Sequence, residues 1–205
     1  MTVLNLPIVK RGRGPTSAPW RKLNNTQSFE SPLTRSVQTL ALPGARWACT
    51  LTWANLTAAD AALMRAFLYA LRGRAGRFYV PHSTVQRPRG TALGTPLVAG
   101  AAQAGATLAT DGWTAGATLL AGDFIGFGAS ELRVVTANAT ADGAGLMSIV
   151  LDEPMRASPA DNSALVLSAP TCIMRLTSDD IESLFRPSAA GPLTDVTIDC
   201  VETWS

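Results

Sequence analysis

Hydrophobic and polar positions approximate an alternating pattern between Trp20 and Trp53, a spacing typical of β-strands, whereas residues 1–17 show no period and predict an extended or flexible start. Residues 37–42 approximate one alternating strand, and Pro43-Gly44 predicts a turn after it. The segment ARWACTLTW then forms a second strand. One face of this strand carries Trp47, Cys49, Leu51 and Trp53, and the other carries Arg46, Thr50 and Thr52. We therefore expect a sheet with its aromatic face turned to a core.

A helical period replaces the alternation after Thr57. Thr57 is followed three residues later by Asp60, which approximates a capping box with an acid in the first turn. Arg72 and Gly73 indicate the end of the helix. The expected buried stripe is Ala59, Ala62, Leu63, Ala66, Phe67, Ala70 and Leu71. A helix with one apolar face must pack on a sheet.

The rest of the chain again predicts strands. FIGF, ELRVVTANAT, GLMSIVL and NSALVL are short strands separated by turn residues, which predicts a small antiparallel barrel or sandwich within residues 93–167. The terminal segment LTDVTIDCVETW alternates strongly and could complete the sheet begun near residue 20. We thus expect a mainly β fold with one α-helix. Residues 1–92 and 168–205 would form one domain, and residues 93–167 a small inserted β-module.

The charges are distributed unevenly. Residues 1–92 hold 13 basic and two acidic residues, whereas residues 93–205 hold four basic and 13 acidic residues. Fifteen of the 17 basic residues are Arg, which suits bidentate contacts at interfaces. The opposite charges can cancel within one subunit, or they can lie on complementary faces that meet between subunits.

The cysteines and the ends of the chain add little chemistry. Cys49, Cys172 and Cys200 each lie in a predicted strand, so we expect free, buried thiols; a disulfide between two of them is possible but not favoured in a reducing cytosol. No apolar run reaches the roughly 18 residues that a transmembrane helix needs. The N-terminal segment has too few apolar residues for a signal peptide. We expect a soluble product of the cytoplasm, without a membrane anchor.

Candidate catalytic and metal-binding groups are few. His82 is the single histidine, in the turn PHSTVQ, so a nucleophilic triad would depend on it alone. Asp179, Asp180 and Glu182 share one polar turn, where solvated or helix-capping roles explain them. GFGASE lacks the third glycine of a dinucleotide-binding fingerprint, and ADGAG is a hairpin turn rather than a calcium loop. We expect no enzyme, metal or cofactor.

Arg72, Arg74 and Arg77 form the densest basic cluster, directly after the helix. With Phe78 and Tyr79 beside it, the cluster could bind nucleic acid, although no known nucleic-acid-binding motif accompanies it. The preferred interpretation is a subunit interface made by these three arginines.

The unit ALPGARWACTLTW, the Ala-rich helix and LRGRAGRFYVP together resemble the distal tail protein family of long-tailed bacteriophages. The segment from GATLLAGDF to SALVL is similar to a small β-module of phage structural proteins. The resemblance covers roughly residues 18–204 and depends on the order and texture of the elements. It implies a split β-sandwich that forms the ring and carries the inserted barrel.

The resemblance also implies a function in the virion. A homo-oligomeric ring at the tail tip, usually sixfold, would join the tail tube protein to the hub and fibres, with DNA only in transit through its channel. The protein would be made and assembled in the host bacterial cytoplasm. Two alternatives stay open: another tail or baseplate component, such as a tube or tube-terminator protein, and a carbohydrate-binding module that uses Trp113 to stack on sugar rings.

Overall fold

The computed structural model describes residues 2–9, 14–82, 86–189 and 192–204. The fold is mainly β with one α-helix, as predicted, and 46% of the residues lie in strands. The chain divides into two compact units. Unit 1 comprises Met1–Phe78 and Met174–Ser205, and unit 2 comprises Tyr79–Ile173. The divisions fall within strands β4 and β12, whereas the sequence pattern suggested boundaries in the flanking loops, after residues 92 and 167.

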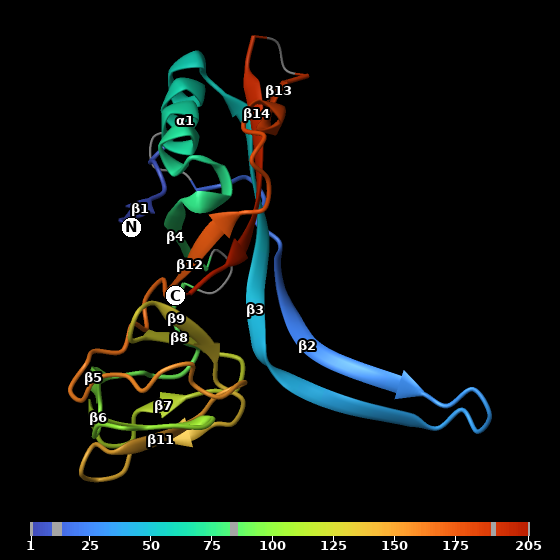
Figure 1. Cartoon of the computed structure of the whole chain (residues 1–205). Coiled ribbons are helices and arrows are strands. Elements are labelled where there is room, and N and C mark those ends of the chain that lie inside the picture. The colour runs from blue at the N-terminus through green and yellow to red at the C-terminus, as the bar shows by residue number, and fades with distance from the viewer. Residues whose placement is uncertain (1, 10–13, 83–85, 190–191, 205) are drawn as a thin grey trace. The chain divides into compact units, whose positions relative to one another are not determined.

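A curled, half-barrel sheet organises unit 1 (Figure 1). The strand order is β1-β4-β12-β14-β3-β2, and β13 pairs with β14 off this path. β14 lies antiparallel to β3, which confirms that the last strand completes the sheet begun near residue 20. The strands are β1 (Val3–Asn5), β2 (Trp20–Glu30), β3 (Val37–Leu56), β4 (Arg77–Pro81), β12 (Thr171–Leu176), β13 (Phe185–Pro187) and β14 (Thr194–Glu202).

The inner face of this sheet holds the core of unit 1. Trp47, Cys49, Leu51 and Trp53 are all buried, so the predicted inward face of the second strand is confirmed. The three cysteines are free and buried, also as predicted. Cys49 and Cys200 are direct partners across β3 and β14, and their sulfur atoms lie 3.1 Å apart beside the Met174 thioether. These thiols act as small core residues.

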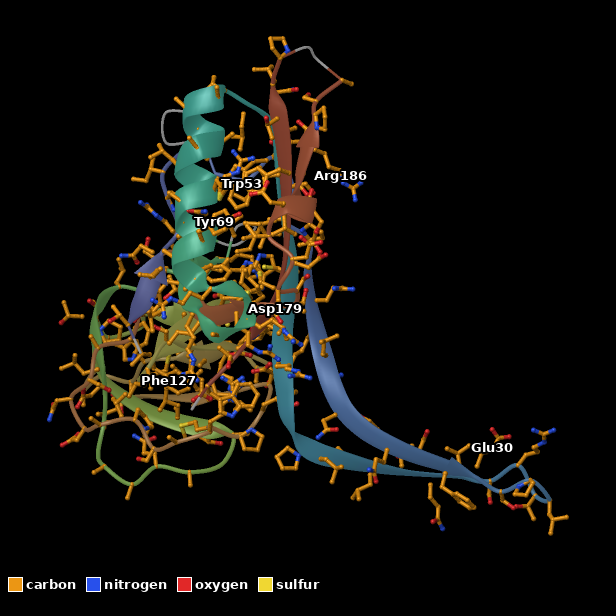
Figure 2. All side chains as sticks on the ribbon, turned by 45° about the horizontal axis from the view of Figure 1, so that its top comes forward. Glu30, Trp53, Tyr69, Phe127, Asp179 and Arg186 are labelled. Atoms are coloured by element: carbon orange, nitrogen blue, oxygen red, sulfur yellow. The ribbon has the colours of Figure 1, made fainter. Side chains whose placement is uncertain are left out.

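Helix α1 (Ala58–Leu71) covers the inner face, and Figure 2 shows Trp53 between the helix and the sheet. The Thr57 hydroxyl accepts a hydrogen bond from the Asp60 amide, which confirms the predicted cap. The predicted apolar stripe is mostly wrong: only Phe67 and Leu71 of its seven residues are buried, and the exposed ones are Ala59, Ala62, Leu63, Ala66 and Ala70. The residues that pack inward are Ala61, Met64, Phe67, Leu68 and Leu71. Each large side chain among them contributes very roughly 2 kcal/mol by burial.

The predicted turn at Pro43-Gly44 is also wrong. β3 continues through these residues as one strand of 20 residues and pairs with β2 along most of its length. The register shifts between Leu23 and Asn25, and the Asn25 side-chain amide donates to the Pro43 carbonyl. Gly44 adopts a φ of 107°. The Pro-Gly pair therefore forms a bulge that bends a long strand, instead of reversing it.

Unit 2 consists of short antiparallel strands around its own core. The largest sheet has the order β11-β6-β5, and β10-β7 and β8-β9 form two separate two-stranded sheets. The strands are β5 (Gly94–Val98), β6 (Thr107–Trp113), β7 (Thr118–Leu119), β8 (Phe124–Phe127), β9 (Glu131–Val134), β10 (Ala139–Thr140) and β11 (Met147–Val150). Val98, Leu108, Leu119, Ile125 and Ile149 are fully buried in one cluster.

Candidate assembly surface

The most unusual surface of unit 1 is a long hairpin, residues 24–44, which we call the arm (Figure 1). β14 pairs with β3 only from Ala48 onward, so the described part of the arm is held to the sheet by its own two strands. Figure 2 places Glu30 near the far end of the arm, where it pairs with Arg35 at 3.1 Å. The arm therefore has two strand edges without a partner among the described residues.

Apolar side chains lie exposed along this arm. Phe29, Leu33, Val37 and Leu40 are all exposed, and Leu33 reaches 93%. The register pairs Phe29 with Gln38 and Gln27 with Leu40, so Phe29 and Leu40 lie on the same face of the hairpin. No charged residue occurs between Lys22 and Glu30 or between Arg35 and Arg46. Such a surface lacks the charges that usually keep exposed strands apart.

Arg74 makes the strongest contact among the three arginines of the predicted cluster. Its backbone amide donates to Asp179 at 2.8 Å, and its guanidinium binds the same carboxylate at 2.7 Å. Hydrogen bonds from the Arg74 side chain and amide lower the pKa of Asp179 below 3.8. Gly73 makes this approach possible, because a Cβ there would lie 2.4 Å from the Asp179 oxygen. Arg74 is thus already paired within unit 1.

Arg72 and Arg77 lie apart from Arg74. Arg72 caps the helix in a left-handed conformation, with φ of 54°, and its amide donates to the Tyr69 carbonyl. Arg72 and Arg77 line a groove of about 250 Å³ together with Thr2 and Leu4. Arg74 lines a second groove, of about 310 Å³. The structure therefore distributes the sequence cluster over two grooves, and the interface role of the three residues stays a prediction.

The outer side of α1 is tied to the loop before β13. Glu182 of the short 3₁₀ helix η3 (Glu182–Leu184) accepts from the Tyr69 hydroxyl at 3.0 Å and pairs with Arg65 at 3.3 Å. The Arg65 guanidinium lies 4.5 Å from the centre of the Phe185 ring. Asp180 accepts from the Ser183 amide, a local role like the one expected, but Asp179 and Glu182 are in ion pairs, so the solvated or capping interpretation is wrong for these two. These contacts hold the loop before β13 against α1.

His82 lies in a core position of unit 2. The side chain is buried, and its ring stacks on Phe124 with 4.2 Å between the ring centres. Burial lowers the pKa of the imidazole below its ordinary value of 6.5. The neighbouring residues 83–85 lie outside the described residues. Within the described chain, no three His, Cys, Asp or Glu side chains are grouped so that they could hold a metal ion.

Trp113 and Phe78 do not offer the surfaces that two alternative functions need. Trp113 is 5% exposed, and its indole nitrogen donates to the Thr110 hydroxyl at 2.8 Å. Stacking on a sugar ring needs an exposed face, so Trp113 cannot serve a carbohydrate site in this conformation. Phe78 is fully buried against Phe67, which removes it from any nucleic-acid surface beside the arginines.

Comparison with known proteins yields no assignment. No protein-family model matches the chain, and no curated protein matches it significantly in sequence. Among the described residues, no helix is long and apolar enough to cross a membrane. The interpretation therefore depends on the physical features of the two units.

Sequence reasoning missed three further arginines, Arg21, Arg46 and Arg175, which line the same groove as Arg74. For Arg46 the sequence did contain a signal, because the alternation places its side chain on the outer face of its strand. Arg21 and Arg175 come from strands more than 150 residues apart in sequence. Only the strand order brings them to one surface.

Proposed function

We propose that this chain is a non-catalytic assembly protein, the subunit of a homo-oligomeric ring at the tip of a bacteriophage tail. The observation that carries the assembly role is the arm, with its unpaired strand edges and exposed apolar side chains. Exposed, uncharged strand edges bind other chains readily, and proteins that stay monomeric usually protect such edges. An arm of this kind is stable in solution when a partner covers it.

The nature of the assembly comes from the resemblance to distal tail proteins. The ring, of six copies by that resemblance, would connect the tail tube protein to the hub and leave a channel for DNA. Unit 1 would be the ring-forming split β-sandwich, and unit 2 the inserted barrel. Two features support this arrangement: unit 1 is discontinuous in sequence, and unit 2 has its own core.

Sedimentation velocity and negative-stain microscopy test the proposal. The wild-type chain should form discrete rings with a central hole. The double substitution Phe29→Glu and Leu40→Glu puts charge on the exposed face of the arm and should abolish the rings, with the thermal midpoint nearly unchanged. A matched control, Leu93→Glu and Leu146→Glu, charges two exposed leucines of unit 2 and should leave the rings intact.

Three results would contradict the proposal. The first is a wild-type chain that is strictly monomeric at high concentration and low salt, and that also fails to bind tail tube protein. The second is an arm variant that assembles as well as the control. The third is the formation of stacked tubes, which would assign the chain to the tube itself.

A further inference from the structure

Two arginines lie at opposite ends of one row across the outer face of the unit 1 sheet. Arg175, Val201, Ala48 and Arg21 are successive register partners on β12, β14, β3 and β2. Directly paired residues point to the same side of a sheet, and Arg46 shares that side because it lies two residues before Ala48. The row spans three strand spacings, roughly 14 Å.

The charges on this row are not neutralised within the described chain. Arg21, Arg46 and Arg175 have neither a side-chain hydrogen bond nor a salt bridge to any described residue, although the charge of Arg175 helps to lower the pKa of Asp179. Arg74, which lines the same groove, is satisfied by Asp179. Three guanidinium groups therefore remain available to a partner.

The lining of the groove indicates the chemistry of that partner. A guanidinium binds carboxylate or phosphate oxygens in pairs. Ala48 and Val201, between the arginines, are buried, so the floor is apolar. Asp199 also lines the groove and accepts from the Thr50 hydroxyl, so the surface has mixed charge. A nucleic-acid backbone carries closely spaced phosphates, some of which would lie beside Asp199 and be repelled, whereas carboxylates on a protein surface can be spaced so that they meet the arginines and avoid Asp199.

The chain itself supplies such a surface. Unit 1 has 13 basic and eight acidic residues, and unit 2 has four basic and seven acidic residues. Two of the unit 2 arginines are already paired inside that unit, Arg89 with Asp123 and Arg133 with Glu131. The Asp111 carboxylate makes no hydrogen bond or salt bridge to the described residues, and Asp142 and Asp161 are exposed. The acidic surplus of unit 2 therefore lies toward solvent.

We infer that the groove lined by Arg21, Arg46 and Arg175 binds carboxylates on unit 2 of a second copy of this chain. This inference rests on the proposed ring, in which each contact joins two different surfaces head to tail. Such a contact requires one basic and one acidic face on every subunit. The arm would supply apolar contact area, and the groove would supply orientation and specificity.

Charge reversal in the groove tests the inference. Arg21→Glu and Arg175→Glu should each raise the concentration at half-assembly by about tenfold at low salt, and the difference should shrink at 0.5 M salt because screening weakens exposed pairs. Arg186→Glu is the matched control. Arg186 is exposed on β13 and has no salt bridge among the described residues, and Figure 2 shows it well away from Asp179. This control should assemble within about twofold of wild type.

Mixing experiments identify the partner surface. Arg21→Glu protein combined with an Asp111→Lys, Asp161→Lys variant should regain assembly, because the reversed faces again complement one another. If both groove variants assemble like Arg186→Glu while the arm variant does not, the inference is overturned and the ring stands. Loss of binding to a labelled DNA oligonucleotide with unchanged assembly would overturn it in favour of nucleic acid. A concentration-independent loss of thermal stability would overturn it in favour of contact within one chain.

Discussion

At the scale of one residue, the burial of His82 makes the stability of unit 2 depend on pH. Its ring is stacked on Phe124 inside unit 2, and burial lowers the pKa of the imidazole below 6.5. The unfolded chain takes up a proton near pH 6.5, whereas the folded chain does so only at lower pH. The stability that the neutral ring contributes is therefore present above pH 6.5 and is lost as the pH falls through the lower folded value.

The pH dependence gives the first prediction. Unit 2 should lose stability between pH 7 and pH 5, a range in which ordinary carboxylates stay ionised. Hydrogen exchange of the unit 2 amides in the whole chain, measured at several pH values, reports this loss. His82→Gln should lower the stability at pH 7 and flatten its dependence on pH. If the stability of unit 2 changes with pH by the same amount in the variant and the wild type, another group is responsible for the pH dependence.

At the scale of elements, the helix was predicted well at its ends and poorly on its face. The Thr57 cap depends on residues three apart, so local sequence determines it. The buried face depends on which side meets the sheet, and Ala on both sides of this helix leaves the choice to tertiary packing. Leu63 was expected inside and is exposed, whereas Leu68 is fully buried.

These two leucines provide a matched pair of substitutions. Leu68→Ala should destabilise unit 1 by about 2–5 kcal/mol, because it leaves a cavity against the sheet. Leu63→Ala should change the stability by less than about 0.5 kcal/mol. Chemical denaturation of both variants, with helix content monitored by circular dichroism, compares them. Similar losses of stability in the two variants would show that α1 packs on the sheet through a different face.

The strands show the same division between local and distant information. The aromatic face of the second strand followed from alternation alone, and it is buried as expected. The continuity of β3 through Pro43-Gly44 could not be predicted, because it depends on β2 and on the Asn25 amide 18 residues away. The arm and the arginine groove also arise from strand pairing. Their residues were visible in the sequence, but their neighbours were not.

At the scale of the whole molecule, each unit has its own core, so we expect unit 1 and unit 2 to unfold in separate transitions. Asp123 is fully buried in unit 2 and accepts hydrogen bonds from the amides of Arg89, Gly90 and Leu120. Burial by itself would raise the pKa of this carboxyl, but the hydrogen bonds outweigh it and lower the pKa. This one side chain therefore ties together the two segments around residues 89 and 121 of unit 2.

Substitution of Asp123 tests whether the two units unfold separately. Asp123→Asn should lower the free energy of unfolding of unit 2 by about 1–3 kcal/mol, because an amide cannot accept all these hydrogen bonds. The unit 1 transition should not move. Asp111→Asn is the control, because the Asp111 carboxylate is half-buried and makes no hydrogen bond or salt bridge to the described residues. Differential scanning calorimetry resolves the two events; a single transition that shifts as a whole would show that the units unfold together.

The order of strands has a consequence for how this chain can diversify. β4 leads into unit 2 and β12 leads out of it, and the two strands are neighbours in the unit 1 sheet. A hairpin turn of a few residues could therefore join them, and a module of another size could replace unit 2 at little cost in loop closure. Evolution or design can therefore exchange the module between β4 and β12 while the arm and the helix stay unchanged.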